Sequence, residues 1–122
     1  MTTPRIRLGK WGEGVAGRFL QEKGYRLLDA NYRCRWGEGD IVAQEGDELV
    51  FVEVRTRRGT QYGTPEESVT AAKARRLIAT AQDCLQQRGQ EGSEWRIDLI
   101  AIRLDGDHRV QDIAHLRYAV EE

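Results

Sequence analysis

The segment Leu49–Arg55 constrains the fold more than any other part of the sequence. Its residues, LVFVEVR, make it the most β-favouring stretch of the chain. The preceding Gly46-Asp47 separates it from another apolar run, and such a pair of residues is typical of a hairpin turn. We therefore predict that Asp40–Glu45 and Leu49–Arg55 are strands that pair antiparallel.

Two amphipathic helices are predicted around this hairpin. From about Leu8 to Lys23, apolar residues recur at helical spacing, and Gly24 supplies a left-handed end. Gly14 and Gly17 inside this helix each cost about 1 kcal/mol relative to alanine, so either packing holds the helix or the glycines let another backbone approach. The second helix is closed by Arg88-Gly89 and has one clean apolar stripe, formed by Ala74, Leu77, Ile78, Ala81, Cys84 and Leu85.

Extended segments and turns fill the rest of the chain. In order, they are an extended Tyr25–Arg35, a turn at Trp36–Gly39, a polar loop from Arg58 to Pro65, a strand at Trp95–Leu104, a turn at Asp105–Asp107 and a strand from Val110 to about Tyr118. The order α-β-β-β-α-β-β predicts helices packed on a mixed five-stranded sheet, of the α/β or α+β class. With the usual length of one domain, residues 1–122 are expected to form a single domain.

Composition indicates a soluble globular protein. Hydrophobic residues make up 39% of the chain and charged residues 32%, a balance typical of neither disordered chains nor membrane proteins. No apolar run approaches the roughly 20 residues of a membrane helix, and the first residues lack the apolar stretch of a signal peptide. We expect a cytoplasmic protein that does not bind membranes, with Cys34 and Cys84 as reduced thiols rather than parts of a disulfide or zinc site.

Charge is unevenly distributed along the chain. Residues 1–35 carry eight Lys and Arg against three Asp and Glu, whereas the remainder carries eleven against seventeen. The net charge of -1 and the pI near 6.2 argue against a purely electrostatic nucleic-acid binder of the histone type. A local basic groove around an acidic metal site remains compatible with this distribution.

Glu53 and Asp40 are the candidate metal ligands. Glu53 interrupts an apolar strand, and a carboxylate buried there needs a basic partner or a metal ion. Asp40 begins the neighbouring strand, close enough for both carboxylates to share one Mg²⁺ or Mn²⁺, cations that keep waters for a phosphate substrate. Arg55 shares the face of Glu53 and is placed to contact the scissile phosphate. The alternative is a surface salt bridge from Glu53 to Arg55 or Arg57, with Asp40 only a turn residue.

Two stretches of the chain resemble a known nuclease signature. Gly37–Ala43, with the sequence GEGDIVA, and Phe51–Arg55, with the sequence FVEVR, resemble the signature of the PD-(D/E)XK nuclease superfamily. Within that superfamily the chain is similar to the YraN-type family of small bacterial proteins. The likeness covers nearly the whole chain through further matching positions: Gly12-Glu13, Gly24-Tyr25, Asn31-Tyr32-Arg33, Gly63-Thr64-Pro65-Glu66, Lys73 and Arg96-Ile97-Asp98.

The resemblance implies a restriction-endonuclease-like αβββαβ core, similar to Holliday-junction resolvases. It also implies that Asp40 and Glu53 are metal ligands and that Glu13, an acid of the first helix, completes this metal site and belongs to the catalytic residues. For Glu13 the alternative is an exposed acid favoured by the helix dipole. The chain departs from the family pattern at Gly39, which replaces Ile, and at Arg55, which replaces the catalytic Lys. Because Arg stays protonated, it can polarise a phosphate oxygen but does not readily serve as the base that activates water.

Basic and aromatic residues near these acids are candidates for nucleic-acid binding. They are Arg33, Arg35, Arg57, Arg58, Lys73, Arg75 and Arg76, with Trp36 and Tyr62 as loop aromatics able to stack on an unpaired base. Lys73 stands at the border of the apolar stripe, where an ordinary snorkelling lysine is an equal alternative. Asp98 is interpreted as a buried hydrogen-bonding residue, and His108 and His115 as surface or packing residues.

Three hypotheses for function follow. The first is a metal-dependent nuclease that acts on DNA, branched or single-stranded. The second is a nucleic-acid-binding module without turnover, suggested by Arg55 in place of Lys. The third is an interaction or scaffold protein that keeps only the fold. The likeness to resolvases, which act as dimers on two-fold substrates, makes a homodimer plausible.

Overall fold

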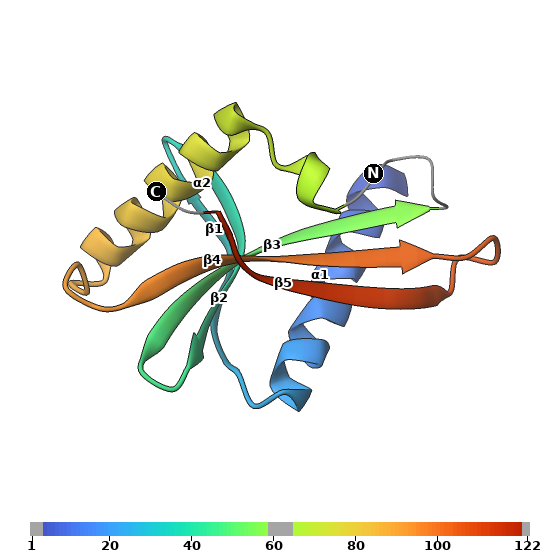
Figure 1. The fold of residues 1–122 in the computed structure, drawn as a ribbon, viewed down its shortest axis with the longest axis horizontal. Helices are drawn as coiled ribbons and strands as arrows, with labels where there is room; N and C mark the ends of the chain where they lie inside the picture. The colour runs from blue at the N-terminus through green and yellow to red at the C-terminus, as the bar shows by residue number, and fades with distance from the viewer. Residues whose placement is uncertain (1–3, 59–64, 121–122) are drawn as a thin grey trace.

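The computed structural model describes residues 4–58 and 65–120 of the chain. In chain order, the elements of these residues are α1 (Pro4–Glu22), β1 (Arg26–Cys34), β2 (Gly37–Glu45), β3 (Glu48–Arg58), the 3-10 helix η1 (Pro65–Ser68), α2 (Ala71–Gln87), β4 (Trp95–Leu104) and β5 (Val110–Val120). The predicted order of long helices and strands is confirmed, with η1 added between β3 and α2 (Figure 1).

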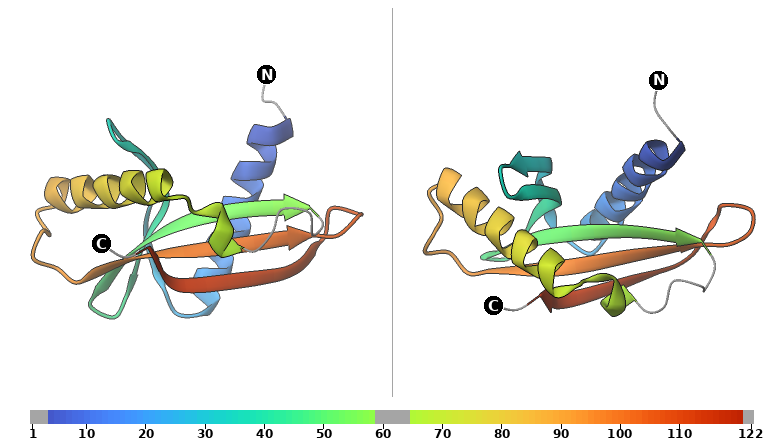
Figure 2. Two further views of the ribbon diagram at one scale, coloured as in Figure 1. Left: turned by 45° about the horizontal axis from the view of Figure 1, so that its top comes forward. Right: turned by 90° about the horizontal axis from the view of Figure 1, so that it is seen from above.

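The five strands form one sheet in the order β1-β2-β3-β4-β5. Neighbouring strands are antiparallel except β3 and β4, which run parallel because the chain passes from one to the other through α2. The two long helices cover opposite faces of the sheet (Figure 2). The predicted class, with helices packed on a mixed five-stranded sheet, is confirmed.

The alternation of side chains in β3 divides the core into two layers. Val50, Val52 and Val54 pack under α1, in a cluster with Leu20 and with apolar residues of β2 and β4. Leu49 and Phe51 point to the other face and pack against Ala81, Cys84 and Leu85 of α2. Since residues two apart share a face, Glu53 and Arg55 continue the α2 face beyond its apolar part.

Glycines allow α1 to lie close to the sheet. A Cβ atom at Gly12 would stand 2.3 Å from the Thr56 hydroxyl oxygen, so there is no room for a side chain between α1 and β3. A Cβ at Gly17 would lie 3.2 Å from Leu27, whereas nothing lies within 4 Å of that position at Gly14. The close neighbours at Gly17 and Gly12 are therefore side-chain atoms, and not the backbone of another element that the internal glycines suggest.

The second helix forms as its apolar stripe predicts. The Thr70 hydroxyl caps its start by accepting a hydrogen bond from the backbone N–H of Lys73 at 3.2 Å. The helix ends at Gln87, followed by Arg88 and by Gly89 in the left-handed region at φ +67°. Among the described residues, no helix has the length and apolar character needed to cross a membrane.

The expected turn at Trp36–Gly39 is wrong in extent. Gly37, Glu38 and Gly39 are strand residues that pair with Cys34, Arg33 and Tyr32 of β1, which leaves only Arg35 and Trp36 in the connection. The glycines misled the prediction, because they interrupt the β-favouring pattern while the backbone continues the ladder. As a result, the β1–β2 hairpin extends beyond the rest of the sheet, beside α2 (Figure 2).

Candidate functional site

A cleft of about 320 Å³ opens on the α2 face of the sheet. Its walls come from the first half of β2, from β3 beyond its buried apolar segment, and from the N-terminal half of α2. The lining includes Asp40, Glu53, Arg55, Lys73, Arg76 and Thr80. Five predicted site residues from three separate elements are thus brought into one cleft, and Thr80 joins them.

Asp40 and Glu53 lie where β2 and β3 stop pairing. Ile41 and Val52 are the final pair of the β2–β3 ladder, so the two acids come next, on the same face of the sheet. The Asp40 carboxylate there accepts a hydrogen bond of 2.8 Å from the backbone N–H of Val54. Asp40 is therefore a strand residue with a fixed carboxylate, not a residue of a turn.

The acid pair is electrostatically strained. Burial, the hydrogen bond to Asp40 and repulsion from the Asp40 charge together raise the pKa of Glu53 to about 8, while Arg55 and Lys73 oppose the rise. Two carboxylates this close favour one shared proton, and a divalent cation between them would favour the fully ionised pair instead.

Replacing Glu53 by Gln should stabilise the metal-free protein at alkaline pH. The raised pKa means that the folded state binds this proton more tightly than the unfolded chain, so stability falls as pH rises from the unfolded value of 4.5 through about 8. Glutamine has no charge to bury, and the gain near pH 9 should be on the order of 1–4 kcal/mol. Urea unfolding in EDTA near pH 5 and near pH 9 measures it. If the free energies of unfolding of the wild type and of Glu53→Gln changed in parallel with pH, the result would contradict the electrostatic strain at Glu53.

Arg55 forms a salt bridge with Glu53, the arrangement that the sequence leaves open as the alternative to a metal site. The Nη1–Oε1 distance is 2.8 Å, and the two side chains are only 16% and 10% exposed. The pair is therefore buried at the cleft and is not a surface bridge. The structure also leaves Arg55 a second donor, because its buried Nε atom has no hydrogen-bond partner among the described residues.

Thr80 provides a second unpaired polar atom. The residue is 4% exposed, and its hydroxyl oxygen has no hydrogen-bond partner in the part of the chain that the structure describes. A Cβ at Gly37 would stand 3.4 Å away, so β2 closes over this hydroxyl. Buried donors without an acceptor are rare in folded proteins. An oxygen-rich ligand in the cleft would satisfy both Thr80 and Arg55.

The sequence does not single out Thr80, and the signal for it is faint. Thr80 is a hydroxyl residue set among the apolar residues of the α2 stripe, seven positions after Lys73. Residues at positions 73, 76 or 77, and 80 share one face of a helix, which explains why Lys73, Arg76 and Thr80 all line the cleft. Burial, followed by the charge of Arg55, lowers the pKa of Lys73.

Glu13 lies beside this cleft, not in it. Its side chain lines a neighbouring groove of about 650 Å³ between α1 and β1, together with Asn31. Burial raises its pKa, the Asp40 charge raises it further, and a hydrogen bond with Asn31 lowers it. Glu13 is thus close enough to sense Asp40. The structure does not gather it with Asp40 and Glu53 into one three-acid cluster.

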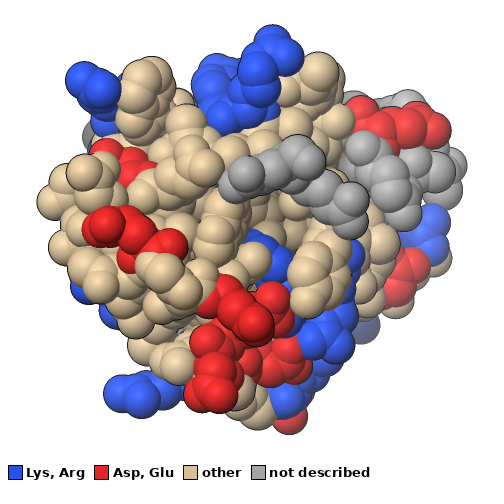
Figure 3. Space-filling model, turned by 60° about the vertical axis from the view of Figure 1, so that its left-hand side comes forward, with Lys and Arg blue, Asp and Glu red and all other residues tan. Residues whose placement is uncertain are grey.

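The remaining basic candidates do not line the cleft. Arg33 pairs with Glu38 of β2 at 3.3 Å on the exposed hairpin, and Arg57 and Arg58 end β3 as exposed residues. Tyr62 lies outside the described residues. Figure 3 shows basic side chains along the upper edge of one face and others beside an acidic patch lower down, so this face has no continuous basic surface. Any nucleic-acid interface here is local.

Asp98 and Arg96 belong to a separate buried network on the α1 face of the sheet. Asp98 is fully buried and accepts hydrogen bonds from Arg96 at 2.9 Å, from His115 at 2.8 Å and from the Tyr118 backbone at 3.1 Å. Arg96 also pairs with Glu48 at 2.6 Å and donates to the Tyr25 hydroxyl at 2.8 Å. This network joins the end of α1 to β3, β4 and β5, as expected for a structural Asp98.

One of the two histidines belongs to this buried network, and the other is exposed. His115 is a packing residue of this network: its other ring nitrogen lies 2.6 Å from the Lys23 ammonium, and its ring meets Phe19 and Tyr25 edge-on. His108 lies exposed in the turn between β4 and β5, in the left-handed region at φ +61°. Neither histidine lines the acidic cleft.

The acid pair fits a hard divalent cation. Within residues 4–58 and 65–120, no group of three or more His, Cys, Asp or Glu side chains is arranged to hold a metal ion. Mg²⁺, however, is commonly held by one or two carboxylates, with waters and substrate phosphates as its other ligands. Asp40 and Glu53 supply that number of carboxylates, and the unpaired Arg55 and Thr80 donors lie in the same cleft.

Fold and cleft together define a class of protein: a mixed α/β domain whose sheet carries an acid pair and clustered cationic donors on one face. The model of a family described as "Uncharacterised protein family UPF0102" matches residues 12–102. The chain belongs to this family. Residues 12–102 include the whole acidic cleft, Glu13 and the Arg96–Asp98 pair.

Curated relatives are similar over their full length. A UPF0102 protein of Roseiflexus castenholzii is 48% identical over 123 residues, covering 100% of this chain and 99% of the relative. A UPF0102 protein of Pelotomaculum thermopropionicum is 44% identical over 119 residues, covering 98% of this chain and 99% of the relative. A third, from Rhodococcus opacus, is 46% identical over 114 residues, with 93% and 96% covered.

Proposed function

We propose that the protein is a metal-dependent phosphodiesterase acting on nucleic acid, with DNA as the substrate we favour. The observation that carries the proposal is the meeting of Asp40 and Glu53 at the open end of the β2–β3 ladder, in a cleft that also holds Arg55, Lys73 and Thr80. Acids for a cation and donors for a phosphate are the two requirements of metal-assisted phosphodiester hydrolysis. The resemblance of GEGDIVA and FVEVR to the PD-(D/E)XK signature adds support.

Each cleft residue has a role that follows from its position. Asp40 and Glu53 would hold Mg²⁺ or Mn²⁺, which when bound activates water and neutralises phosphate charge. Arg55 is held by Glu53 through one nitrogen, and its unpaired Nε is free to donate to a phosphate oxygen. Lys73 adds a positive charge from α2. Glu13 would act from the neighbouring groove, through its effect on Asp40.

A cleavage assay tests this proposal. Supercoiled plasmid and a branched DNA junction are incubated with the protein in Mn²⁺ or Mg²⁺, and in EDTA as control. Asp40→Ala, purified in parallel, controls for contaminating nucleases. Cleavage that needs the metal and disappears in the variant supports the proposal. No cleavage by the wild type, with either ion and on either DNA, overturns it.

Thr80→Val should weaken the substrate phosphate contact without unfolding the protein. Valine matches the shape of threonine but lacks the hydroxyl, and no hydrogen bond within the described residues is lost. We expect catalytic efficiency to fall about 10- to 100-fold, the usual consequence of losing one hydrogen bond to a charged group. Thr80→Ser, which keeps the hydroxyl, should recover most of it. Equal activity of the valine and serine variants would remove Thr80 from the site.

A nucleic-acid-binding module without turnover is the second candidate function. Arg55 favours it, because the family pattern has Lys at this position and Arg does not readily accept the proton of an attacking water. Metal-independent binding of DNA without cleavage would support this module. Failure to bind any nucleic acid at low salt would instead favour a scaffold role.

The proposal places the protein in the cytoplasm, which agrees with the free thiols Cys34 and Cys84.

A further inference from the structure

The turn between β1 and β2 carries an exposed aromatic ring. Trp36 is 45% exposed and belongs to neither core cluster. The guanidinium of Arg35 lies 4.5 Å from the centre of the Trp36 ring. This cation–π contact orients the indole while leaving much of its surface open.

The turn is held in place next to the acidic cleft. Cys34 and Gly37 pair directly across it, and Gly37 both lines the cleft and closes over Thr80. Trp36 precedes Asp40 by four residues, which is roughly 13 Å of strand. A nucleic-acid strand with the rise of a duplex covers that length in about four nucleotides. A base on Trp36 is therefore within reach of a phosphate bound at the acid pair.

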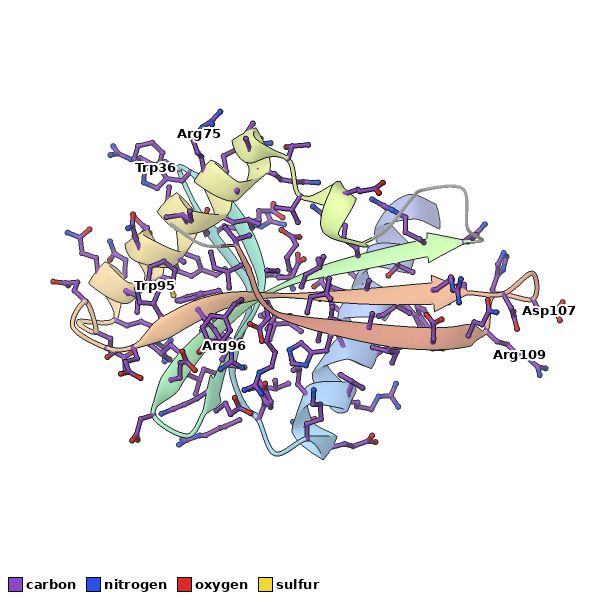
Figure 4. All side chains as sticks on the ribbon, in the orientation of Figure 1. Trp36, Arg75, Trp95, Arg96, Asp107 and Arg109 are labelled. Atoms are coloured by element: carbon purple, nitrogen blue, oxygen red, sulfur yellow. The ribbon has the colours of Figure 1, made fainter. Side chains whose placement is uncertain are left out.

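Basic residues of a second element face the same end of the molecule. Figure 4 shows Trp36 and Arg75 of α2 both pointing outward there. Arg76, the next residue of α2, lines the cleft itself. Basic side chains therefore stand both at the tip of the hairpin, where Arg35 contacts Trp36, and in the cleft, where Arg76 lies, so each place offers a local contact for a phosphate.

We propose that Trp36 and Arg35 form a stacking platform for an unpaired base, which makes single-stranded nucleic acid, including the unpaired strand at a branch, the substrate class. Every base has a face that can stack on an aromatic ring, so the platform has no strict sequence preference. The interior base faces of a blunt duplex are already stacked on their neighbours, so duplex gains little from Trp36. This inference rests on the proposed function for the site of cleavage, but the platform itself requires only binding.

The surroundings of Trp36 argue against a protein partner. The other large exposed apolar side chains among the described residues are Trp11, Val110 and Tyr118, which belong to α1 and β5 and not to the hairpin tip. A single ring beside a charged residue does not make the contiguous apolar patch that a protein partner usually covers. A ring in contact with one guanidinium, that of Arg35, does match the alternating bases and phosphates of a single strand.

Fluorescence anisotropy in EDTA tests the platform, using a labelled oligothymidylate of about 12 nucleotides and a blunt duplex of about 20 base pairs. Trp36→Ala should weaken binding of the oligothymidylate at least about fivefold and change duplex binding less than about twofold. Trp36→Phe should keep most of the affinity. Trp11→Ala is the matched control, because Trp11 is 40% exposed on α1, and it should behave as the wild type.

Several results would overturn the platform. These are absence of binding by the wild type, equal loss of both probes in Trp36→Ala, or unchanged binding by that variant. A change in oligomeric mass without a loss of binding would assign Trp36 to a protein interface instead. Because no metal is present, the outcome is independent of cleavage. Selective loss in Trp36→Ala beside an inactive wild type would keep the platform and reject the nuclease, and active cleavage with unchanged binding would do the reverse.

Discussion

Asp40→Asn and Glu53→Gln are each expected to lower metal-dependent cleavage at least about 10³-fold, measured in single-turnover assays on a labelled oligonucleotide. Each substitution keeps the shape of the side chain and removes one carboxylate, a proposed metal ligand, from a pair that meets at the end of the β2–β3 ladder. The double variant should be no slower than the slower single variant. Two ligands of one ion act as a unit, so their losses do not multiply.

The control for this experiment is an acid outside the cleft. Asp112→Asn changes an exposed residue of β5 that pairs with Arg103, and it should keep wild-type activity. All variants are compared by thermal unfolding, so that a loss of activity is not confused with a loss of fold. If the double variant instead lost the product of the two single effects, the acids would be acting independently, and a shared cation would be ruled out.

The sequence predicts the acid pair because strand geometry is local. Gly46-Asp47 places the hairpin turn, the two-residue period of β3 assigns Glu53 and Arg55 to one face, and the antiparallel ladder carries Asp40 to the same face. No tertiary information is needed for these steps. The second helix is similarly predictable, since one apolar stripe determines which side of α2 packs on the sheet.

Features that depend on contacts between distant elements were not predictable. Thr80 becomes a site residue only because β2 passes over it, and its hydroxyl gives no sequence signal beyond a polar residue in an apolar stripe. Glu13 is placed by the packing of α1 against β1, which puts it in the adjacent groove. The glycines of β2 hid three residues of strand, so Trp36 was expected in a longer loop and not at the tip of a tight hairpin.

Replacing Asp98 by Ala is expected to cost on the order of 3–5 kcal/mol of stability, measured by urea unfolding near neutral pH. Asp98 is fully buried and is the acceptor for Arg96 and His115, so alanine would leave Arg96 buried with one partner fewer. Burial alone would raise the pKa of Asp98, but hydrogen bonds from His115, Arg96 and Tyr118 outweigh it and lower that pKa. The stabilisation is therefore present above the unfolded value of 3.8 and lost as pH falls through the lower folded value.

Asp112→Ala is again the matched control, because it breaks an ion pair whose side chains are 39% and 51% exposed, and it should cost less than about 1 kcal/mol. Equal losses for the two variants would contradict a buried network that holds α1 to the sheet.

The two buried acids, Asp98 and Glu53, therefore have opposite effects on the stability of the metal-free fold. Asp98 has its cationic partners within the fold and stabilises it, whereas the ionised Glu53, crowded by Asp40, destabilises the metal-free protein. Such a difference is expected when one acid serves the fold and the other serves a ligand.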